Sequence, residues 1–482
     1  MPENGEESSN DTRWPNAIPY VLKLGNFMET SWKHSVSLQA SSTVYLTILV
    51  GPFCLAVSIF FCLLFSLLHL QSTPTGFPSS PSCRFPGPTT LVASLFNQCS
   101  TLPPTPEPWS PDAFLDDPEV AAQRPEMDAA CNLWEGRWIY EPESYPLWTT
   151  GSCPWVETGF ECEALGRHDT DYMKFRWQPH GCNLPRFNAS DIRRRLKGRR
   201  LVFVGDSLCR NQFESALCLL GIDLPNVSAV IERTGNNLTR KVDTMVYDFT
   251  DFGFTVEYHL SHFLVGFHRA PADAPPHIGA VVNTDTVDPL FARRLFDENP
   301  EGLILVLNAG HWFTPSKISH QNVSFLVNNQ TRPDIDETEG FRLSMLRVAD
   351  WIQQWPAKAA NATAVFRTYA PAHFTGGSWD HSGGCSETHP TLPFDPTTPS
   401  DLWQDPSVLF AQISRDAMTQ PEQIRKPIIN DITNMSYSRS DAHIARYWTG
   451  AIGSDCSHWC LPGVPDTWNE MLFASLTANN IL

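Results

Sequence analysis

Residues 200–220, RLVFVGDSLCRNQFESALCLL, constrain the fold more than any other stretch of the sequence. They start with a short apolar run, 201–204, which is typical of a buried strand. Apolar residues then recur at helical spacing from 213 to 220 and predict a helix. The Gly-Asp-Ser between the two predicts a turn that places Ser207 at the carboxyl end of a strand, where open α/β sheets bind their ligands.

Other strand-like and helix-like patterns alternate along the same part of the chain. Residues 303–307 and 364–369 are strand-like, and apolar residues between them recur at helical spacing over 341–352. This alternation favours an α/β fold in which a parallel sheet carries helices on both faces. The chain of 482 residues has a formal net charge of −18, which argues against a broad basic face for nucleic acid.

An uncharged run of 25 residues, 44–68, precedes this region. At about 1.5 Å per residue a helix of this length crosses a hydrocarbon core of about 30 Å. The run is too long and apolar for a core helix, and for a cleaved signal peptide it starts too far from Met1 and lacks an Ala-x-Ala-like end. We therefore predict a polar cytosolic tail over 1–43 and a transmembrane signal anchor over 44–69.

Glycosylation sequons indicate the orientation of this anchor. One sequon, at Asn10, precedes the anchor, and seven follow it. The seven begin at Asn188, Asn226, Asn237, Asn322, Asn329, Asn361 and Asn434. Because only lumenal or extracellular chain is N-glycosylated, we expect a single-pass type II protein with a lumenal body.

Composition divides the rest of the chain into three parts. Residues 70–129 are rich in Pro, Ser and Thr and predict an extended stem. Residues 130–187 are dense in cysteine and tryptophan and predict a small lobe of loops and short strands, followed by the α/β domain over 188–482. Nine cysteines lie in this body: Cys131, Cys153, Cys162, Cys182, Cys209, Cys218, Cys385, Cys456 and Cys460.

These cysteines favour disulfide bonds in a lumenal domain, with a metal site that includes Cys456 and Cys460 as the alternative. The odd count leaves one thiol free, and Cys209, beside Ser207, is the candidate. Between Cys456 and Cys460 lies His458, three residues after Asp455. One turn of chain can bring that carboxylate to the imidazole and leave the second ring nitrogen free to take a proton from Ser207.

Each of these short patterns also has a purely structural interpretation. Asp206 can cap a helix, Ser207 can be a turn residue, and an aspartate near one of 15 histidines is unsurprising. Only together, in the context of strand, turn and helix, do they indicate a serine active site.

Longer motifs from Cys131 to the C-terminus resemble the plant trichome-birefringence-like, PC-esterase-type family of polysaccharide O-acetyltransferases. The motifs are CNLWEGRWI at 131, YPLW at 145, RWQPHGCNLPRF at 176, VGDSLCRNQFES at 204, LNAGHWF at 307, FRTYAPAHFTGGSWDHSGGC at 366 and DCSHWCLPG at 455. The resemblance implies an SGNH/GDSL-like three-layer α/β/α domain plus a smaller lobe, with a cleft between them. It assigns Ser207 as nucleophile, His458 as base and Asp455 as its partner.

The resemblance also implies a covalent acetyl-serine intermediate and four disulfides. The pairs are Cys131–Cys182, Cys153–Cys218, Cys162–Cys460 and Cys385–Cys456. Further site residues are hypotheses. Gly205, Asp206, Arg210 and Asn308 are candidates for the oxyanion or substrate site beside the Ser207 N–H, although Asn308 can also simply satisfy a turn. Trp312 and Trp459 are candidates for stacking on sugar rings, although both can equally be core residues.

By this resemblance the acceptor is a wall polysaccharide such as xylan, xyloglucan, mannan or pectin, and the donor is acetyl-CoA or another acetylated carrier. No bound cofactor or metal is expected, and the location is the Golgi membrane. Two alternatives remain open: a carbohydrate O-acetyl esterase with the same triad, and a non-catalytic wall-polysaccharide-binding protein.

Overall fold

The computed structural model describes residues 110–128, 130–239, 242–270, 274–391, 406–447 and 453–482. The predicted tail, the predicted anchor and most of the predicted stem lie outside these residues. Within them, no helix combines the length and the apolar character that a membrane crossing needs.

The part of the predicted stem that the structure describes, residues 110–128, is not extended. Residues 110–128 contain a 3-10 turn and helix α3 (Pro118–Gln123), which Asp117 caps through the Glu119 N–H. Asn183 holds this segment on the body by donating from Nδ2 to Ala121 O at 2.9 Å. Capping, together with the ion pairs that Asp116 makes with Arg124, Arg137 and Arg176, therefore folds a stretch that its proline content assigned to the stem.

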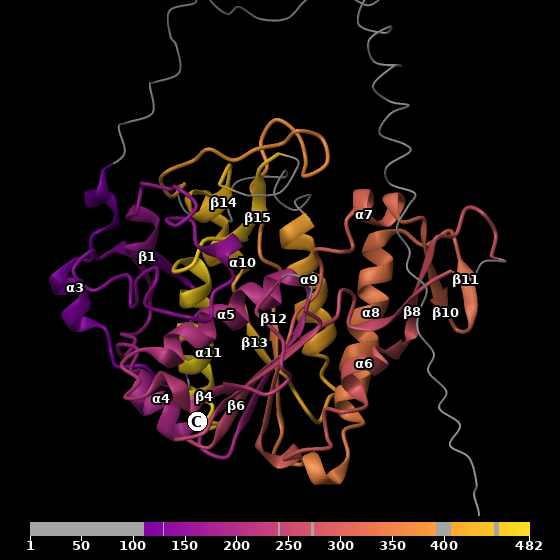
Figure 1. Ribbon diagram of the computed structural model, residues 1–482, viewed down its shortest axis with the longest axis horizontal. Helices are drawn as coiled ribbons and strands as arrows, with labels where there is room; N and C mark the ends of the chain where they lie inside the picture. Colours follow the sequence, from indigo (N-terminus) through magenta and orange to yellow (C-terminus); the bar gives the residue numbers. More distant parts are fainter. Residues whose placement is uncertain (1–109, 129, 240–241, 271–273, 392–405, 448–452) are drawn as a thin grey trace, which may run out of the picture. The chain divides into compact units, whose positions relative to one another are not determined.

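A seven-stranded sheet in the order β13-β12-β9-β3-β6-β5-β4 forms the centre of the body (Figure 1). Its strands are β3 (Arg200–Gly205), β4 (Val230–Glu232), β5 (Thr244–Phe249), β6 (Phe254–Leu260), β9 (Leu303–Leu307), β12 (Thr363–Arg367) and β13 (Ile428–Asn430). The strands from β13 to β6 are parallel, but β5 and β4 are antiparallel additions at one edge. The prediction of a parallel sheet is thus wrong at this edge, because the four residues between β5 and β6 are too few for a crossover.

Helices cover both faces of this sheet. From β3, Leu201 and Phe203 join the core that includes α5 (Ser207–Gly221) and α11 (Val464–Ala478). Val202 and Val204 join the opposite core, with α8 (Glu337–Gln353) and α9 (Pro406–Met418). Figure 1 shows the two groups of helices on either side of the strands. The structure is therefore a three-layer α/β/α arrangement, as the sequence pattern predicts.

Further elements surround these layers. A second sheet, which the sequence did not predict, contains β7 (Val265–Arg269), β8 (Ala280–Val287), β10 (Val323–Val327) and β11 (Gln330–Arg332). Two antiparallel pairs join β1 (Gly136–Tyr140) to β2 (Phe175–Pro179) and β14 (His443–Ala445) to β15 (Asp455–Trp459). The remaining helices are α4 (Ala189–Arg195), α6 (Pro289–Ala292), α7 (Pro315–His320) and α10 (Thr433–Tyr437).

Four disulfides hold the body together, and they are the pairs that the resemblance implies. The bonds are Cys131–Cys182, Cys153–Cys218, Cys162–Cys460 and Cys385–Cys456. Because both Cys456 and Cys460 are bonded, the alternative of a metal site at this pair is excluded. Cys209 is a free, buried thiol, and it lies in the first turn of α5 rather than in the loop before it.

Candidate active site

Ser207 begins helix α5 directly after the central strand β3. Asp206 is the N-cap of the helix: its Oδ1 accepts from the Leu208 N–H and from Asn308 Nδ2, both at 3.0 Å. Asp206 and Asn308 are almost fully buried, and neither lines the pocket that contains Ser207. Their side chains therefore stabilise the turn before α5, and they do not line the pocket that contains Ser207.

Gly205 is required by the same close packing. A Cβ atom at this position would collide with Asn308 Oδ1. The strand that ends at Leu307 therefore approaches the turn so closely that only glycine fits. Gly205 and Asn308 contribute to the position of Ser207 rather than to the lining of its pocket.

His458 and Asp455 lie on β15, and the imidazole reaches Ser207. His458 Nε2 is 2.7 Å from Ser207 Oγ, and His458 Nδ1 is 2.8 Å from Asp455 Oδ2. Since a carboxylate only accepts, Nδ1 carries the proton and Nε2 presents its lone pair to the serine hydroxyl. The three sequence-predicted residues therefore form one continuous series of hydrogen bonds.

The surroundings of Asp455 stabilise its ionised form. Burial alone would raise its pKa, but the neighbouring His458 and the N–H groups of His458 and Ser457 hold the pKa of this carboxyl well below its ordinary value. A permanently charged carboxylate fixes the His458 tautomer and stabilises the imidazolium that forms when the serine loses its proton.

Strand β15 is anchored at several points around His458. Disulfides hold Cys456 and Cys460 on either side of it. The backbone oxygen of His458 accepts from His443 Nδ1 at 2.9 Å. Asn211, four residues after Ser207 on α5, accepts from the Trp459 N–H at 2.9 Å and donates to the Trp459 oxygen at 3.2 Å.

Sequence reasoning missed Asn211. Asn211 is one of several buried polar residues of α5, together with Gln212, Glu214 and Ser215, so the sequence alone gave no signal that singles it out.

A pocket of about 180 Å³ opens at Ser207 and His458. Its other lining residues are Phe160, Arg210, Val242, Tyr258, Leu260, His262 and Trp312. Of the hypothetical site residues, Arg210 and Trp312 are thus in the pocket. The sequence did not indicate the others, which come from different strands and loops and share no motif.

Arg210 is a buried cation with unused hydrogen-bonding capacity. Its Nη2 is 3.3 Å from Glu157 Oε2, while its Nη1 has no hydrogen-bond partner among the described residues. A buried N–H group without a partner is costly, so Nη1 is a strained feature of a cationic side chain that lines the pocket.

Trp459 does not line the pocket and is wrong as a sugar-stacking residue. Its side chain is fully buried, with its ring centre 5.7 Å from that of Trp468 and 4.0 Å from that of His443. The alternative interpretation, core packing, is the one that the structure supports.

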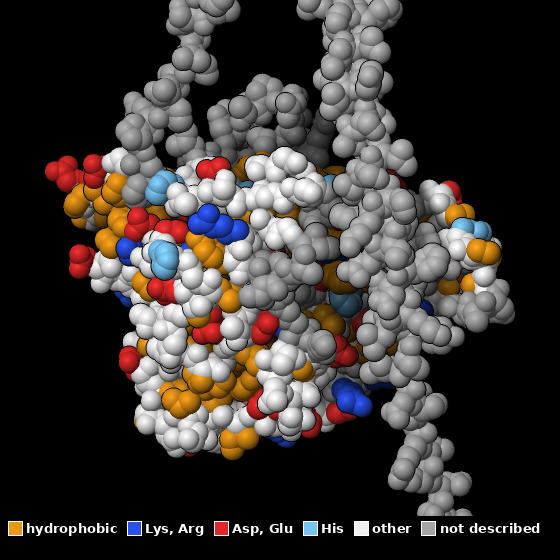
Figure 2. Space-filling view, turned by 45° about the horizontal axis from the view of Figure 1, so that its top comes forward, with side chains coloured by type: hydrophobic (Ala, Val, Ile, Leu, Met, Phe, Trp, Pro, Cys, Tyr) orange, Lys and Arg blue, Asp and Glu red, His pale blue; other side chains and the backbone are white. Residues whose placement is uncertain are grey.

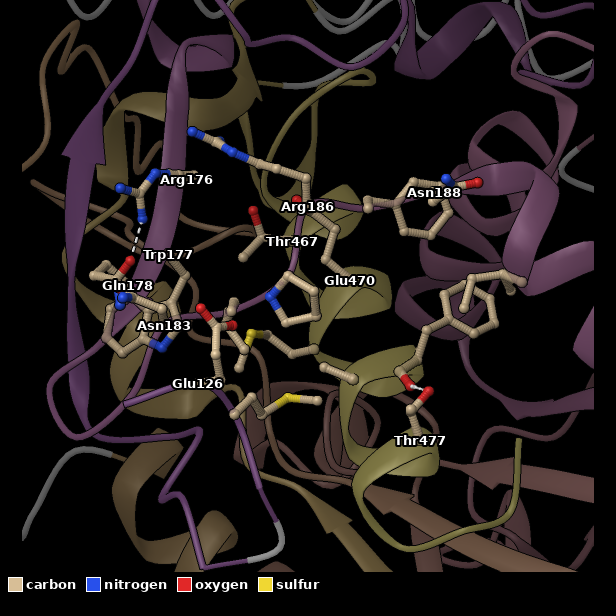
Figure 3. A pocket seen from close by; sticks show the side chains of 18 of the residues that line it. Glu126, Arg176, Trp177, Gln178, Asn183, Arg186, Asn188, Thr467, Glu470 and Thr477 are labelled. Carbon is tan, nitrogen blue, oxygen red and sulfur yellow. Dashed lines mark hydrogen bonds between the residues drawn. The ribbon is translucent and has the colours of Figure 1, made fainter. Parts of the chain in front are cut away.

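A larger cavity, of about 560 Å³, lies elsewhere in the body. Figure 3 shows Arg176 and Trp177 from β2 facing Thr467 and Glu470 from α11 across it. None of the predicted site residues lines this cavity, so its size does not make it the reaction centre. Outside the grey atoms, Figure 2 shows few Lys and Arg side chains, scattered among acidic ones, which agrees with the acidic net charge.

Comparisons with known proteins match the whole body. The sequence profile of PC-Esterase, a GDSL/SGNH-like acyl-esterase family found in Pmr5 and Cas1p, matches residues 184–475, and that of the PMR5 N terminal domain matches residues 129–183. The chain is 35% identical to Arabidopsis thaliana trichome berefringence-like 7 over 350 residues, which cover 72% of this chain and 73% of that protein.

Two further Arabidopsis thaliana proteins are similar over the same part of the chain. Trichome birefringence-like 6 is 33% identical over 353 residues, 72% of this chain and 70% of its own. Trichome birefringence-like 9 is 33% identical over 359 residues, 73% of this chain and 84% of its own.

Proposed function

The chain belongs to the PC-Esterase family of GDSL/SGNH-like acyl esterases, and from this premise we propose that it is an O-acetyltransferase acting on cell-wall polysaccharide. The observation that carries the proposal is the series of hydrogen bonds from Ser207 Oγ through His458 to Asp455. The acceptor class is a wall polysaccharide such as xylan, xyloglucan, mannan or pectin, and the donor is acetyl-CoA or another acetylated carrier.

The first half-reaction transfers the acetyl group from the donor to Ser207. His458 Nε2 takes the proton of Ser207 as Oγ attacks the acetyl carbonyl carbon of the donor. The tetrahedral intermediate collapses when the bond to the donor's leaving atom breaks, and that atom takes the proton from His458. Acetyl-Ser207 and the deacylated donor are the products.

The second half-reaction transfers the acetyl group from Ser207 to the sugar. A sugar hydroxyl gives its proton to His458 and attacks the acetyl-Ser207 carbonyl carbon. The Ser207 C–O bond breaks, and Oγ recovers the proton from His458. The acetylated sugar leaves and the enzyme is regenerated, so no redox step or metal ion is required.

Negative charge develops on the acetyl oxygen in both halves. The Ser207 N–H at the start of α5 is one donor for it, since helix N-termini stabilise anions. Arg210 adds a positive charge that stabilises this oxygen in this proposal, because its side chain lines the pocket. The small pocket volume of about 180 Å³ supports a short acyl group such as acetyl.

We also propose that the body is lumenal and anchored in the Golgi membrane by residues 44–69. In support, all seven sequon asparagines after this segment are exposed in the folded body: Asn188, Asn226, Asn237, Asn322, Asn329, Asn361 and Asn434. Two measurements on plant microsomes test this orientation. N-glycosidase should lower the mass of the protein after the membrane is lysed. Protease added to intact microsomes should leave the body uncut.

The test of activity is an assay with an acetyl donor and a panel of polysaccharides, read by mass spectrometry. Acetylated sugar that requires Ser207 supports the transferase. The esterase remains the second candidate because the family is described as acyl esterases. Acetate release without acetylated sugar would establish the esterase, and unchanged function of Ser207→Ala in cells would establish the non-catalytic binding protein.

A further inference from the structure

Trp379 is a large aromatic side chain on the surface that core packing does not explain. It is 43% exposed, although its indole Nε1 donates to Ser316 Oγ in α7 at 2.8 Å. The hydrogen bond fixes the orientation of the ring and leaves much of the ring open to solvent. A tryptophan whose Nε1 is held by a hydrogen bond offers an oriented aromatic face on which an apolar ligand surface can stack.

Lys317 connects Trp379 to the Ser207 pocket. Its Nζ lies 5.8 Å from the ring centre of Trp379 and 5.0 Å from the ring centre of Trp312. Trp312 in turn lines the pocket that contains Ser207 and His458. The three side chains therefore form a strip, aromatic, cationic and aromatic, from the pocket that contains Ser207 to the exposed ring of Trp379.

The amino group of Lys317 is held within this strip. Nζ donates to the backbone oxygen of His311 at 2.8 Å, and burial lowers the lysine pKa. An ammonium group has three protons, so one bond to His311 leaves donors for further hydrogen bonds. Lys317 Nζ lies over the rings of both tryptophans, and the ring centre of His262 is 3.8 Å from that of Trp312. The exposed aromatic surface of the strip is therefore that of Trp379, with a hydrogen-bond donor beside it.

Charges around Trp379 favour a neutral ligand over an anionic one. Asp380 follows it, and hydrogen bonds from Ser378 and His381 lower the pKa of this carboxyl to about 2. The ionised Asp380 carboxylate places a negative charge beside Trp379. It would repel a phosphate-bearing donor there, whereas it would not repel a neutral glycan.

We propose that Trp312, Lys317 and Trp379 form a subsite for sugar residues of the acceptor chain beyond the one that is acetylated, with Trp379 as the outer platform. Pyranose rings stack their apolar C–H faces on indole rings, and their hydroxyls accept from the ammonium group between them. The subsite makes the enzyme prefer a polysaccharide over a single sugar. This inference rests on the proposed acceptor class of the same active site.

A binding experiment tests the subsite without requiring turnover. The full-length protein carrying Ser207→Ala is titrated calorimetrically with neutral wall oligosaccharides of increasing length. We expect affinity to rise with length, and the added change Trp379→Ala to weaken binding of the longest oligosaccharide roughly tenfold. Leu290→Ala is the matched control, because Leu290 is 79% exposed in α6 and belongs to no site described above.

Steady-state kinetics then distinguish an effect on acceptor binding from an effect on donor binding. In the active protein, Trp379→Ala should raise KM for the longest acceptor roughly tenfold and so remove the preference for length, and Trp379→Phe, which keeps the ring, should have a smaller effect. Length-dependent binding that Trp379→Ala leaves intact overturns the subsite, and so does a raised KM for the donor alone. Absence of any acetyl transfer, with length-dependent binding lost in Trp379→Ala, would instead refute the proposed function and leave the glycan subsite standing.

Discussion

Asn211 joins the nucleophile's helix to the base's strand through two hydrogen bonds with the Trp459 backbone, in addition to the contact between Ser207 and His458. Asn211→Ala leaves that buried N–H and C=O unpaired and lets β15 shift relative to Ser207. We predict a fall in kcat of at least about tenfold, a small change in KM and a stability loss of about 2 kcal/mol. Asn430→Ala, at another fully buried amide, is the control for steady-state kinetics and thermal unfolding. Equal kcat losses in both variants would refute the positioning role.

Strand β15 carries both Asp455 and His458, and its disulfide to Cys385 holds it from outside the sheet. Cys385→Ala with Cys456→Ala opens a loop of 71 residues, and Cys131→Ala with Cys182→Ala opens one of 51. Both double variants should lose about 4 kcal/mol of stability by the loop-closure argument. Only the first should also lower the acetyl-transfer rate below the unfolding transition, because only it removes one of the bonds that hold the strand of His458 in place. Equal rates in the two, measured at a temperature where both are folded, would contradict this.

Helix α11 contacts the predicted 130–187 segment, where Tyr145 donates to Glu470 Oε2 at 2.8 Å, and both residues line the larger cavity, in which Figure 3 labels Glu470. Burial raises the pKa of the Glu470 carboxyl from 4.5 to about 7. Below pH 4.5 the carboxyl is protonated in both the folded and the unfolded protein. As the pH rises towards 7, only the unfolded chain releases this proton, so the free energy of unfolding falls by on the order of 3 kcal/mol. Glu470→Gln, whose amide oxygen still accepts from Tyr145, should be more stable than the natural chain at pH 8 and no more stable at pH 4, as denaturant unfolding at both pH values shows. An unchanged difference between the two proteins across this range would refute the shift.

Sequence patterns predicted the three layers because strand and helix periodicities are local. They missed the antiparallel edge and the second sheet, since pairing direction depends on distant segments. The Asp455–His458 contact spans three residues and follows from spacing, whereas the 2.7 Å contact between Ser207 and His458 joins residues 251 apart. The residue patterns offered that contact only as a hypothesis, and the family resemblance assigned both roles. The burial of Trp459 and the orientation of Asn308 are tertiary, so no motif could predict them.

The central claim is that Ser207 carries the acetyl group, and trapping the acyl-enzyme tests it most directly. The protein is mixed with acetyl donor without acceptor, quenched in acid, digested and analysed by mass spectrometry. We predict one acetyl group on the peptide containing Ser207, formed at least as fast as acceptor turnover, absent from Ser207→Ala and strongly slowed in His458→Ala. Acetyl transfer to polysaccharide by Ser207→Ala at the natural rate, with no acetylated Ser207 peptide in the natural protein, would contradict the account.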